Sequence, residues 1–285
     1  MRELPRPFLK WAGGKTRLLA ELDRQLPAEF STYHEPFLGG GALFFHLVAA
    51  RRVGRAILSD INAALVETYL GLRDELEEVL RHLQDHAARH DRDHYYRTRD
   101  EDTEGGEMAA RAARFIYLNR TCYNGLYRES RSGRFNVPMG RYANPNICNE
   151  KLLRAASQAL ESAEIVCAPF SAAAGRALAG DLVYMDPPYQ PLTSTSSFTT
   201  YHRGGFGESE QQHLGRVFRE LAGRGVQVIL SNSDTDLVRK IYAGLPQEQV
   251  LVSRSINSRA SGRGAVAELI VRGGDDFLDT PQGEG

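Results

Sequence analysis

The chain has 285 residues, of which 42% are hydrophobic and 25% are charged, and its formal net charge at pH 7 is -1. These proportions are typical of a soluble globular protein, and the length suits one large domain or one domain with an insertion. No apolar run approaches the roughly 18 residues of a membrane span, and the net charge argues against a uniformly basic nucleic-acid-binding protein. The N-terminus lacks a signal-peptide core and the three cysteines show no metal spacing, so we expect reduced thiols and a cytoplasmic protein.

A glycine turn opens the ordered part of the sequence at Phe8-Leu9-Lys10-Trp11-Ala12-Gly13-Gly14-Lys15-Thr16. Its end resembles a phosphate-binding P-loop, but that motif needs a further glycine five residues before Gly14, where Leu9 stands. We therefore predict a glycine turn that leads into a helix over residues 15–25. Lys15 lies at the start of this helix, where a cation and free N–H groups suit a carboxylate.

A second glycine turn lies in His34-Glu35-Pro36-Phe37-Leu38-Gly39-Gly40-Gly41, before an apolar helix that we expect to reach residue 50. Residues 55–60 form a predicted strand, which ends at Asp60 about twenty residues after the glycines. Nucleoside-binding α/β folds place an acid at this spacing to accept hydrogen bonds from ribose hydroxyls. Glycines also allow a ligand to approach the backbone closely. The combination predicts a nucleoside-binding α/β core.

Residues 62–99 are predicted to be helical, because apolar residues recur at helical spacing and no proline interrupts them. Four histidines recur here every four residues and would form one stripe along a helix. Such pairs can bind zinc, but no cysteine accompanies them and charged residues alternate with them. We therefore expect a solvated helix face. The four residues are His82, His86, His90 and His94.

The most basic part of the sequence lies between residues 111 and 154, which hold nine arginines or lysines and two glutamates. Its first part is predicted to be a helix and the rest a glycine-punctuated loop or hairpin. Arginine can pair with guanine and asparagine with adenine, and aromatic side chains can fill the gap left by an extruded base. The segment fits contact with a nucleic acid, although a core helix with a solvated surface explains the composition equally well.

A short apolar run, Leu182-Val183-Tyr184-Met185, indicates a buried central strand of a parallel sheet. The strand ends in Asp186-Pro187-Pro188-Tyr189, where the prolines stop the ladder at the edge at which α/β sheets bind ligands. This turn suits methylation of an exocyclic amino group. Asp186 and the Pro187 carbonyl would each accept an N6 hydrogen of adenine, and the extruded base would stack on Tyr189. The alternative is a turn that only caps the strand.

The remaining sequence predicts a long loop, further elements of an α/β fold and a tail. The Ser/Thr-rich loop has the length of a lid or binding loop, and the end of the chain is expected to be disordered. The ranges are 191–206 for the loop, 208–223 for a helix, 226–232 for a strand, 250–254 and 267–271 for a strand pair joined by a basic loop, and 274–285 for the tail.

Together these motifs resemble the Dam family of DNA adenine-N6 methyltransferases, which methylate adenine in GATC. The resemblance covers residues 5–271 and includes the two glycine turns and Asp60-Ile61-Asn62. Two departures are Ser233, where relatives often have histidine, and the loop 254–263, which has fewer lysines than in relatives. The other matching stretches are Tyr117-Leu118-Asn119-Arg120, Tyr123-Asn124-Gly125-Leu126, Phe135-Asn136-Val137-Pro138, Asp186-Pro187-Pro188-Tyr189, Phe198-Thr199, Tyr201-His202 and Arg254-Ser255-Ile256.

The resemblance implies a Rossmann-like class I methyltransferase core of the α/β class, with a mixed seven-stranded sheet. It also implies an inserted, mostly helical target-recognition domain. On this basis we assign residues 1–62 and 155–273 to a discontinuous catalytic domain that binds S-adenosyl-L-methionine. Residues 63–154 would form the target-recognition domain.

Site residues follow from the resemblance position by position. The catalytic set is Asp186, Pro187, Pro188 and Tyr189. S-adenosyl-L-methionine would contact Trp11, Lys15, Phe37, Gly39, Gly41, Asp60 and Asp186. Double-stranded DNA would contact Lys10, Tyr123, Asn124, Leu126, Arg128, Pro138 and Arg141.

The resemblance therefore implies a monomeric DNA adenine-N6 methyltransferase that uses S-adenosyl-L-methionine and no metal. An N4-cytosine or RNA methyltransferase with the same core is one alternative, and a DNA-binding relative without catalysis is another. Aspartate rather than serine at position 186 disfavours the cytosine enzyme. The intact Asp186 motif and Asp60 disfavour the loss of catalysis.

Overall fold

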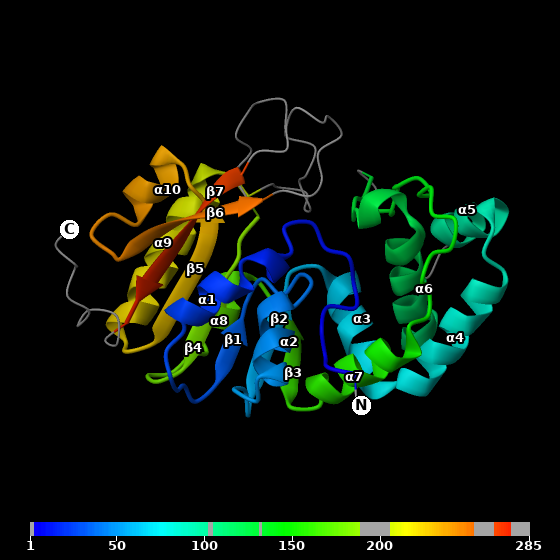
Figure 1. Ribbon diagram of the computed structural model, residues 1–285, viewed down its shortest axis with the longest axis horizontal. Coiled ribbons are helices and arrows are strands. Elements are labelled where there is room, and N and C mark those ends of the chain that lie inside the picture. Colours follow the sequence, from blue (N-terminus) through cyan, green and yellow to red (C-terminus); the bar gives the residue numbers. More distant parts are fainter. Residues whose placement is uncertain (1–2, 102–104, 131–132, 189–205, 254–264, 275–285) are drawn as a thin grey trace.

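A computed structural model of the protein describes residues 3–101, 105–130, 133–188, 206–253 and 265–274. One half of the molecule is built around a β-sheet, and the other half is a group of helices (Figure 1). No helix within these residues is long and apolar enough to cross a membrane. The predictions that fall outside the described residues are those for Tyr189, the loop 191–205, the basic loop 254–263 and the tail from residue 275.

The sheet has seven strands in the order β3-β2-β1-β4-β5-β7-β6. Strands β1 to β5 pair in parallel, whereas β7 is antiparallel to both β5 and β6. This topology confirms the predicted α/β, Rossmann-like core with a mixed seven-stranded sheet. The strands are β1 (Tyr33–Glu35), β2 (Ala56–Asp60), β3 (Ala163–Cys167), β4 (Leu182–Met185), β5 (Gln227–Ser233), β6 (Gln247–Ser253) and β7 (Ala265–Gly273).

Helices cover both faces of the sheet, which is why β4 is apolar along its whole length. Its side chains alternate, so that Tyr184 packs into one hydrophobic core while Val183 and Met185 pack into the other. The predicted buried central strand is therefore confirmed. The first face carries η1 (Lys15–Arg17), α1 (Leu19–Gln25), α2 (Ala42–Ala49) and α3 (Ala63–Asp74), and the second carries α8 (Phe170–Ala174), α9 (Glu208–Gly223) and α10 (Asp236–Ile241).

The helical half packs directly against the sheet half (Figure 1). Leu65, Tyr95 and Ile116 of the helical half belong to the same hydrophobic core as Leu43 of α2 and Leu58 of β2 in the sheet half. The two halves therefore share buried apolar surface, which holds them in one arrangement. Besides α3, the helical half contains α4 (Leu76–Ala88), α5 (Arg92–Asp100), α6 (Met108–Thr121), the short η2 (Tyr123–Gly125) and α7 (Glu150–Leu160).

Residues 62–99, which were predicted to be helical, form three helices, α3, α4 and α5, because the chain breaks twice within this range. At the first break, the Glu75 carboxylate accepts a hydrogen bond from the backbone N–H of Ala109 at 2.9 Å. At the second break, Asp91 is the N-cap of α5 and accepts a hydrogen bond from the backbone N–H of His94 at 2.6 Å. A cap of this kind contributes about 1 kcal/mol and starts a new helix.

The prediction that the four histidines form a solvated helix face is wrong. The turn before α5 brings three of them around Tyr117. His86 Nδ1 lies 3.0 Å from His94 Nε2, and the His86 ring stacks on Tyr117 with the ring centres 4.6 Å apart. His90 Nδ1 lies 2.9 Å from the Tyr117 hydroxyl. Burial lowers the pKa of His86 to about 4 and also lowers those of His90 and His94. These histidines are therefore part of the packing of the helical half.

We expect the protein to lose stability as the pH falls from 7 toward 4. The three packed histidines have lowered pKa values in the folded state, so they are protonated there at lower pH than in the unfolded chain, where histidine titrates near 6.5. Each such histidine contributes at most about 1.4 kcal/mol per pH unit to the free energy of unfolding. Urea unfolding of a His86→Gln variant at pH 5, 6 and 7 should give a shallower slope than the wild type. A His82→Gln control, altered on the surface of α4, should keep the wild-type slope, and equal slopes in both variants would contradict the assignment.

Candidate active site

The glycine turn between β1 and α2 is held by the carboxylate at the end of β2. Asp60 Oδ2 accepts a hydrogen bond from the Gly39 N–H, and Oδ1 accepts one from the Asn62 N–H, both at 3.0 Å. Gly39 has a φ of +47°, and a Cβ at this position would lie 2.8 Å from the indole of Trp11. Glycine is therefore required here by both conformation and space. The structure thus brings together the predicted cofactor residues Trp11, Gly39, Gly41 and Asp60.

Aromatic side chains border this turn on two sides. Trp11 stacks on Tyr127 and Phe115 of the helical half, with ring centres 5.6 and 6.4 Å apart. Phe37 stacks on Phe170, with ring centres 5.3 Å apart. The predicted cofactor residue Trp11 therefore contacts the helical half as well as the glycine turn.

The catalytic aspartate predicted at the end of β4 is held through one of its two oxygens. The buried ammonium of Lys15 lies 2.7 Å from Asp186 Oδ1 and 3.0 Å from the carbonyl oxygen of Gly13. The Ser231 hydroxyl donates a hydrogen bond to the same Oδ1 at 3.1 Å. No side chain or N–H in the described part of the chain donates to Oδ2. Burial raises the pKa of Asp186, an effect that Lys15 opposes.

Glu35, at the end of β1, is a third acid at this edge and was not among the predicted site residues. Its carboxyl group is buried, accepts a hydrogen bond from the Tyr33 hydroxyl at 2.9 Å and bonds to the backbone N–H of Phe44. Burial raises the pKa of Glu35 to about 8. Burial therefore favours the protonated form of Glu35. Its position directly before the Pro36 turn was the signal in the sequence that could have identified it.

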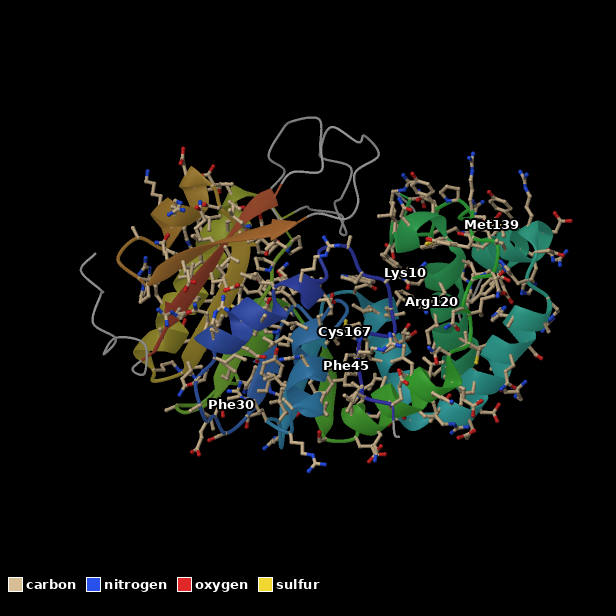
Figure 2. All side chains as sticks on the ribbon, viewed as in Figure 1. Lys10, Phe30, Phe45, Arg120, Met139 and Cys167 are labelled. Atoms are coloured by element: carbon tan, nitrogen blue, oxygen red, sulfur yellow. The ribbon has the colours of Figure 1, made fainter. Side chains whose placement is uncertain are left out.

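Most of the predicted DNA-contacting residues lie on one hairpin-like segment after α6. Residues 121–129 run antiparallel to residues 135–140, with bridges between Cys122 and Met139 and between Glu129 and Phe135. Met139 marks this segment at the outer end of α6 (Figure 2). The predicted residues on it are Tyr123, Asn124, Arg128, Pro138 and the neighbouring Arg141, which are exposed, and Leu126, which is half-buried.

Lys10 is joined to this segment by Asn119, whose role the sequence did not predict. The Lys10 N–H donates to Asn119 Oδ1 at 2.8 Å, and Asn119 Nδ2 donates to the Lys10 carbonyl at 2.7 Å. The same amide lies 3.4 Å from the Gly125 carbonyl. Lys10 Nζ lies 4.0 Å from the ring centre of Tyr142. Lys10 is therefore fixed between the sheet and α6 (Figure 2).

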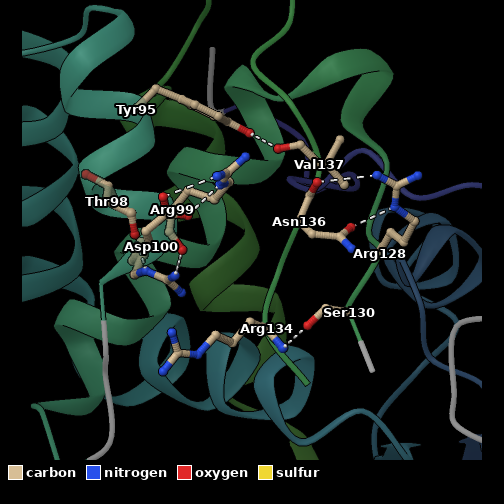
Figure 3. A network of polar contacts seen from close by, with 10 residues as sticks. Tyr95, Thr98, Arg99, Asp100, Arg128, Ser130, Arg134, Asn136 and Val137 are labelled. Atoms are coloured by element: carbon tan, nitrogen blue, oxygen red, sulfur yellow. Dashed lines mark hydrogen bonds and ion pairs between the residues drawn. The ribbon is translucent and has the colours of Figure 1, made fainter. Parts of the chain in front are cut away.

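Arg128 is oriented by a neighbour across the hairpin. Its Nε donates to Asn136 Oδ1 at 2.7 Å, and its Nη2 donates to the Asn136 carbonyl at 3.3 Å (Figure 3). A guanidinium has five N–H groups, so three remain for another partner. The hairpin is held further by the Arg134 N–H, which donates to Ser130 Oγ at 3.3 Å (Figure 3). The exposed guanidinium of Arg128 is therefore presented in a defined orientation.

The basic residues between positions 111 and 154 differ in whether they form ion pairs within the fold. On the helices, Arg111 pairs with Glu67 at 3.0 Å and Arg154 pairs with Glu77. These arginines are neutralised within the fold. Three arginines lie on or beside the hairpin: Arg128, Arg134 and Arg141. Within the described residues, none of these three forms an ion pair.

Comparison with known proteins shows to which family this chain belongs. The family described as D12 class N6 adenine-specific DNA methyltransferase matches residues 11–256. The chain belongs to this family. The Type II methyltransferase M.MjaIII of Methanocaldococcus jannaschii is 39% identical over 283 residues, with 93% of this chain and 98% of the relative covered. The DNA adenine methylases of Serratia marcescens and Escherichia coli K12 are each 38% identical over 93% of this chain, with 97% and 94% of their own lengths covered.

Family membership confirms the resemblance drawn from the motifs and makes the protein an adenine-specific DNA methyltransferase. The 246 residues from 11 to 256 include the glycine turns, Asp60, the hairpin and the Asp186 turn. DNA is therefore the substrate class of this enzyme, and the sheet edge around Asp186 is its candidate active site.

Replacing Gly125 with alanine should disturb the hairpin more than the same change at Gly133. Both glycines have positive φ, so both variants have the left-handed strain of roughly 1–2 kcal/mol. A Cβ at Gly125 would also lie 2.4 Å from the Lys10 Cβ, whereas a Cβ at Gly133 meets nothing within 4 Å. Overpacking of this kind costs about a further 1–3 kcal/mol. Urea unfolding and kcat/KM on duplex DNA should both be worse for Gly125→Ala. Equal losses in the two variants would show that the contact with Lys10 does not matter.

Proposed function

We propose that this enzyme transfers the methyl group of S-adenosylmethionine to N6 of an adenine flipped out of duplex DNA, with GATC as the preferred site. The proposal is based on the hydrogen bonding of the Asp186 carboxylate. Its Oδ1 is held by Lys15 and Ser231, while Oδ2 has no donor among the described residues. An acceptor of this kind at the carboxyl end of a central strand suits an amino group presented by a ligand.

The adenine amino group needs such an acceptor because its lone pair is delocalised into the ring. Asp186 Oδ2 would accept one N6 hydrogen, and the Pro187 carbonyl would accept the other. This arrangement favours a pyramidal nitrogen, whose lone pair is then available to attack the methyl group. The base must leave the duplex to reach Asp186, and Tyr189 would stack on it.

The residues around the glycine turn fit the cofactor. Asp60 accepts the Gly39 and Asn62 N–H groups at the end of β2, the position where nucleoside-binding α/β folds place an acid for ribose hydroxyls. Trp11 and Phe37 offer aromatic faces, and an edge that carries acids suits a ligand with ammonium and sulfonium charges. When bound, S-adenosylmethionine supplies a methyl group that is already activated as a sulfonium. Lys15 and Gly41 complete the set of cofactor residues that we propose.

We propose further that residues 63–154 act as the target-recognition domain and that the enzyme works as a monomer. The exposed arginines and aromatic side chains of the hairpin support the first proposal, because they combine phosphate-binding charge with groups that can read base edges. The adenine-specific family match disfavours the N4-cytosine and RNA alternatives. The ordered contacts of Asp186 disfavour the loss of catalysis.

Replacing Asp186 with asparagine should lower the transfer rate by about 10²–10³, because the amide provides a weaker acceptor than the carboxylate. The measurement is transfer of a tritiated methyl group from labelled S-adenosylmethionine to a duplex that contains GATC. Asp74→Asn, which alters a surface acid paired with Arg73, is the control and should keep the wild-type rate. Near-wild-type turnover by the Asp186 variant would refute the assigned role.

Replacing Arg128 with alanine should relax discrimination at one base pair by about 1–3 kcal/mol if its free N–H groups pair with a guanine edge. The measurement is kcat/KM on GATC and on each singly substituted site at one salt concentration. Arg134→Ala, which removes a nearby exposed charge, should lower kcat/KM about equally on every site. The same uniform loss for Arg128→Ala would mean that Arg128 only contacts phosphate.

The preferred site can be read directly from methylated DNA. Long-read sequencing of DNA from a methylation-free host that expresses this chain should show N6-methyladenine in GATC. A host expressing the Asp186→Asn variant is the control for background signal. Methylation of adenine in a different sequence would overturn the GATC proposal and leave the proposed transfer intact.

A further inference from the structure

Two hydroxyl groups form a chain beneath the Asp186 carboxylate. Tyr184 of β4 precedes Asp186 by two residues, and Asp186 directly follows the strand, so both side chains lie on the same face of the sheet. Ser231 of β5 lies beside Asp186, because the register pairs Met185 with Leu230. The Tyr184 hydroxyl lies 2.8 Å from Ser231 Oγ, which lies 3.1 Å from Asp186 Oδ1. Tyr184 and Ser231 are both buried.

The direction of these hydrogen bonds follows from the groups themselves. Asp186 is paired with the Lys15 ammonium, and an ionised carboxylate can only accept hydrogen bonds. The single Ser231 proton is therefore donated to Asp186. The Tyr184 hydroxyl must then donate to Ser231, and burial raises the pKa of Tyr184, so the phenol keeps its proton. Donors linked in this way polarise one another and strengthen the bond to the carboxylate.

Ser231 and Lys15 both bind Oδ1 and so define the orientation of the carboxylate. A single aspartate side chain can rotate about its Cβ–Cγ bond and exchange the positions of its two oxygens. Two donors that converge on Oδ1 from η1 and β5 oppose this rotation and leave Oδ2 available. The buried Tyr184 phenol then keeps Ser231 in place through its hydrogen bond, because an unpaired hydroxyl in the core would cost free energy.

We propose that Ser231 and Tyr184 are positioning residues, which hold Asp186 so that Oδ2 meets the substrate amino group. This inference rests on the proposed function and deepens it. Neither residue would touch the adenine or the methyl group. The charges that act most strongly on Asp186 are Lys15, which favours its ionised form, and Glu268 of β7, which disfavours it. The Ser231 hydroxyl adds to the effect of Lys15.

The test compares Ser231→Ala, Ser231→Thr and Tyr184→Phe in single-turnover transfer with saturating S-adenosylmethionine and duplex DNA. Loss of a hydrogen bond to a charged group corresponds to about a 10- to 100-fold slower transfer in Ser231→Ala. Calorimetric Kd values for cofactor and DNA should stay close to those of the wild type. The acid limb of the pH–rate profile should move to higher pH, because a carboxylate that loses a donor is protonated more easily. Ser231→Thr keeps the hydroxyl and should restore the rate and the profile.

Tyr184→Phe gives a second, independent readout. It should slow transfer less than Ser231→Ala in the wild-type background, and it should have no further effect in the Ser231→Ala background, because it acts through Ser231. Ser59→Ala is the matched control, since Ser59 on β2 is also buried and its hydroxyl has no partner among the described residues. This control should keep the wild-type rate and pH profile.

Two results would overturn the inference. One is a Ser231→Ala variant with the wild-type rate and an unshifted acid limb, while Asp186→Asn remains inactive; the proposed function would then stand without the positioning role. The other is a rate loss in Ser231→Ala that Ser231→Thr fails to restore and that Tyr184→Phe adds to independently. If Asp186→Asn itself retains transfer, the proposed function fails first, so the two failures are distinguishable.

Discussion

The parallel pairing of β1, β2, β4 and β5 places Glu35, Asp60, Asp186 and Ser231 at one edge of the sheet. Three carboxyl groups in this position lose hydration and repel one another. Each carboxyl group is stabilised in a different way. Burial favours the protonated form of Glu35, Asp60 accepts backbone N–H groups, and Asp186 pairs with Lys15. The geometry of the candidate active site depends on this division, because Asp186 Oδ2 then has no donor among the described residues.

The segment that leads into η1 connects this edge to the helical half. Within six residues, Lys10 is held by Asn119, Trp11 stacks on Tyr127, and Lys15 reaches Asp186. One residue proposed to bind DNA, Lys10, and two proposed to bind the cofactor, Trp11 and Lys15, therefore lie on one short stretch of chain. Because that stretch is packed against both halves, a displacement of the hairpin also strains the contacts of Trp11.

Much of the fold and part of the site could be predicted from local sequence. The apolar run of β4, the helix over residues 208–223 and the glycine turn each follow from a short repeating pattern or from backbone conformation. The apolar spacing of residues 62–99 predicted helix there, but it continues across the two breaks that divide this range into α3, α4 and α5. The breaks lie at Glu75, whose carboxylate accepts the Ala109 N–H of α6, and at Asp91, the N-cap of α5. The spacing of apolar residues predicts neither contact.

The sequence by itself determined which chemical groups this protein carries at the ends of its strands, since Asp60 and Asp186 each follow an apolar run. It also determined the concentration of arginine and aromatic residues after α6. Only the tertiary structure decided which groups meet. Ser231 reaches Asp186 across 45 residues of sequence, and Asn119 reaches Lys10 across 109. Such partners depend on strand register and helix packing, which are set by the burial of the whole core and not by any local stretch of the chain.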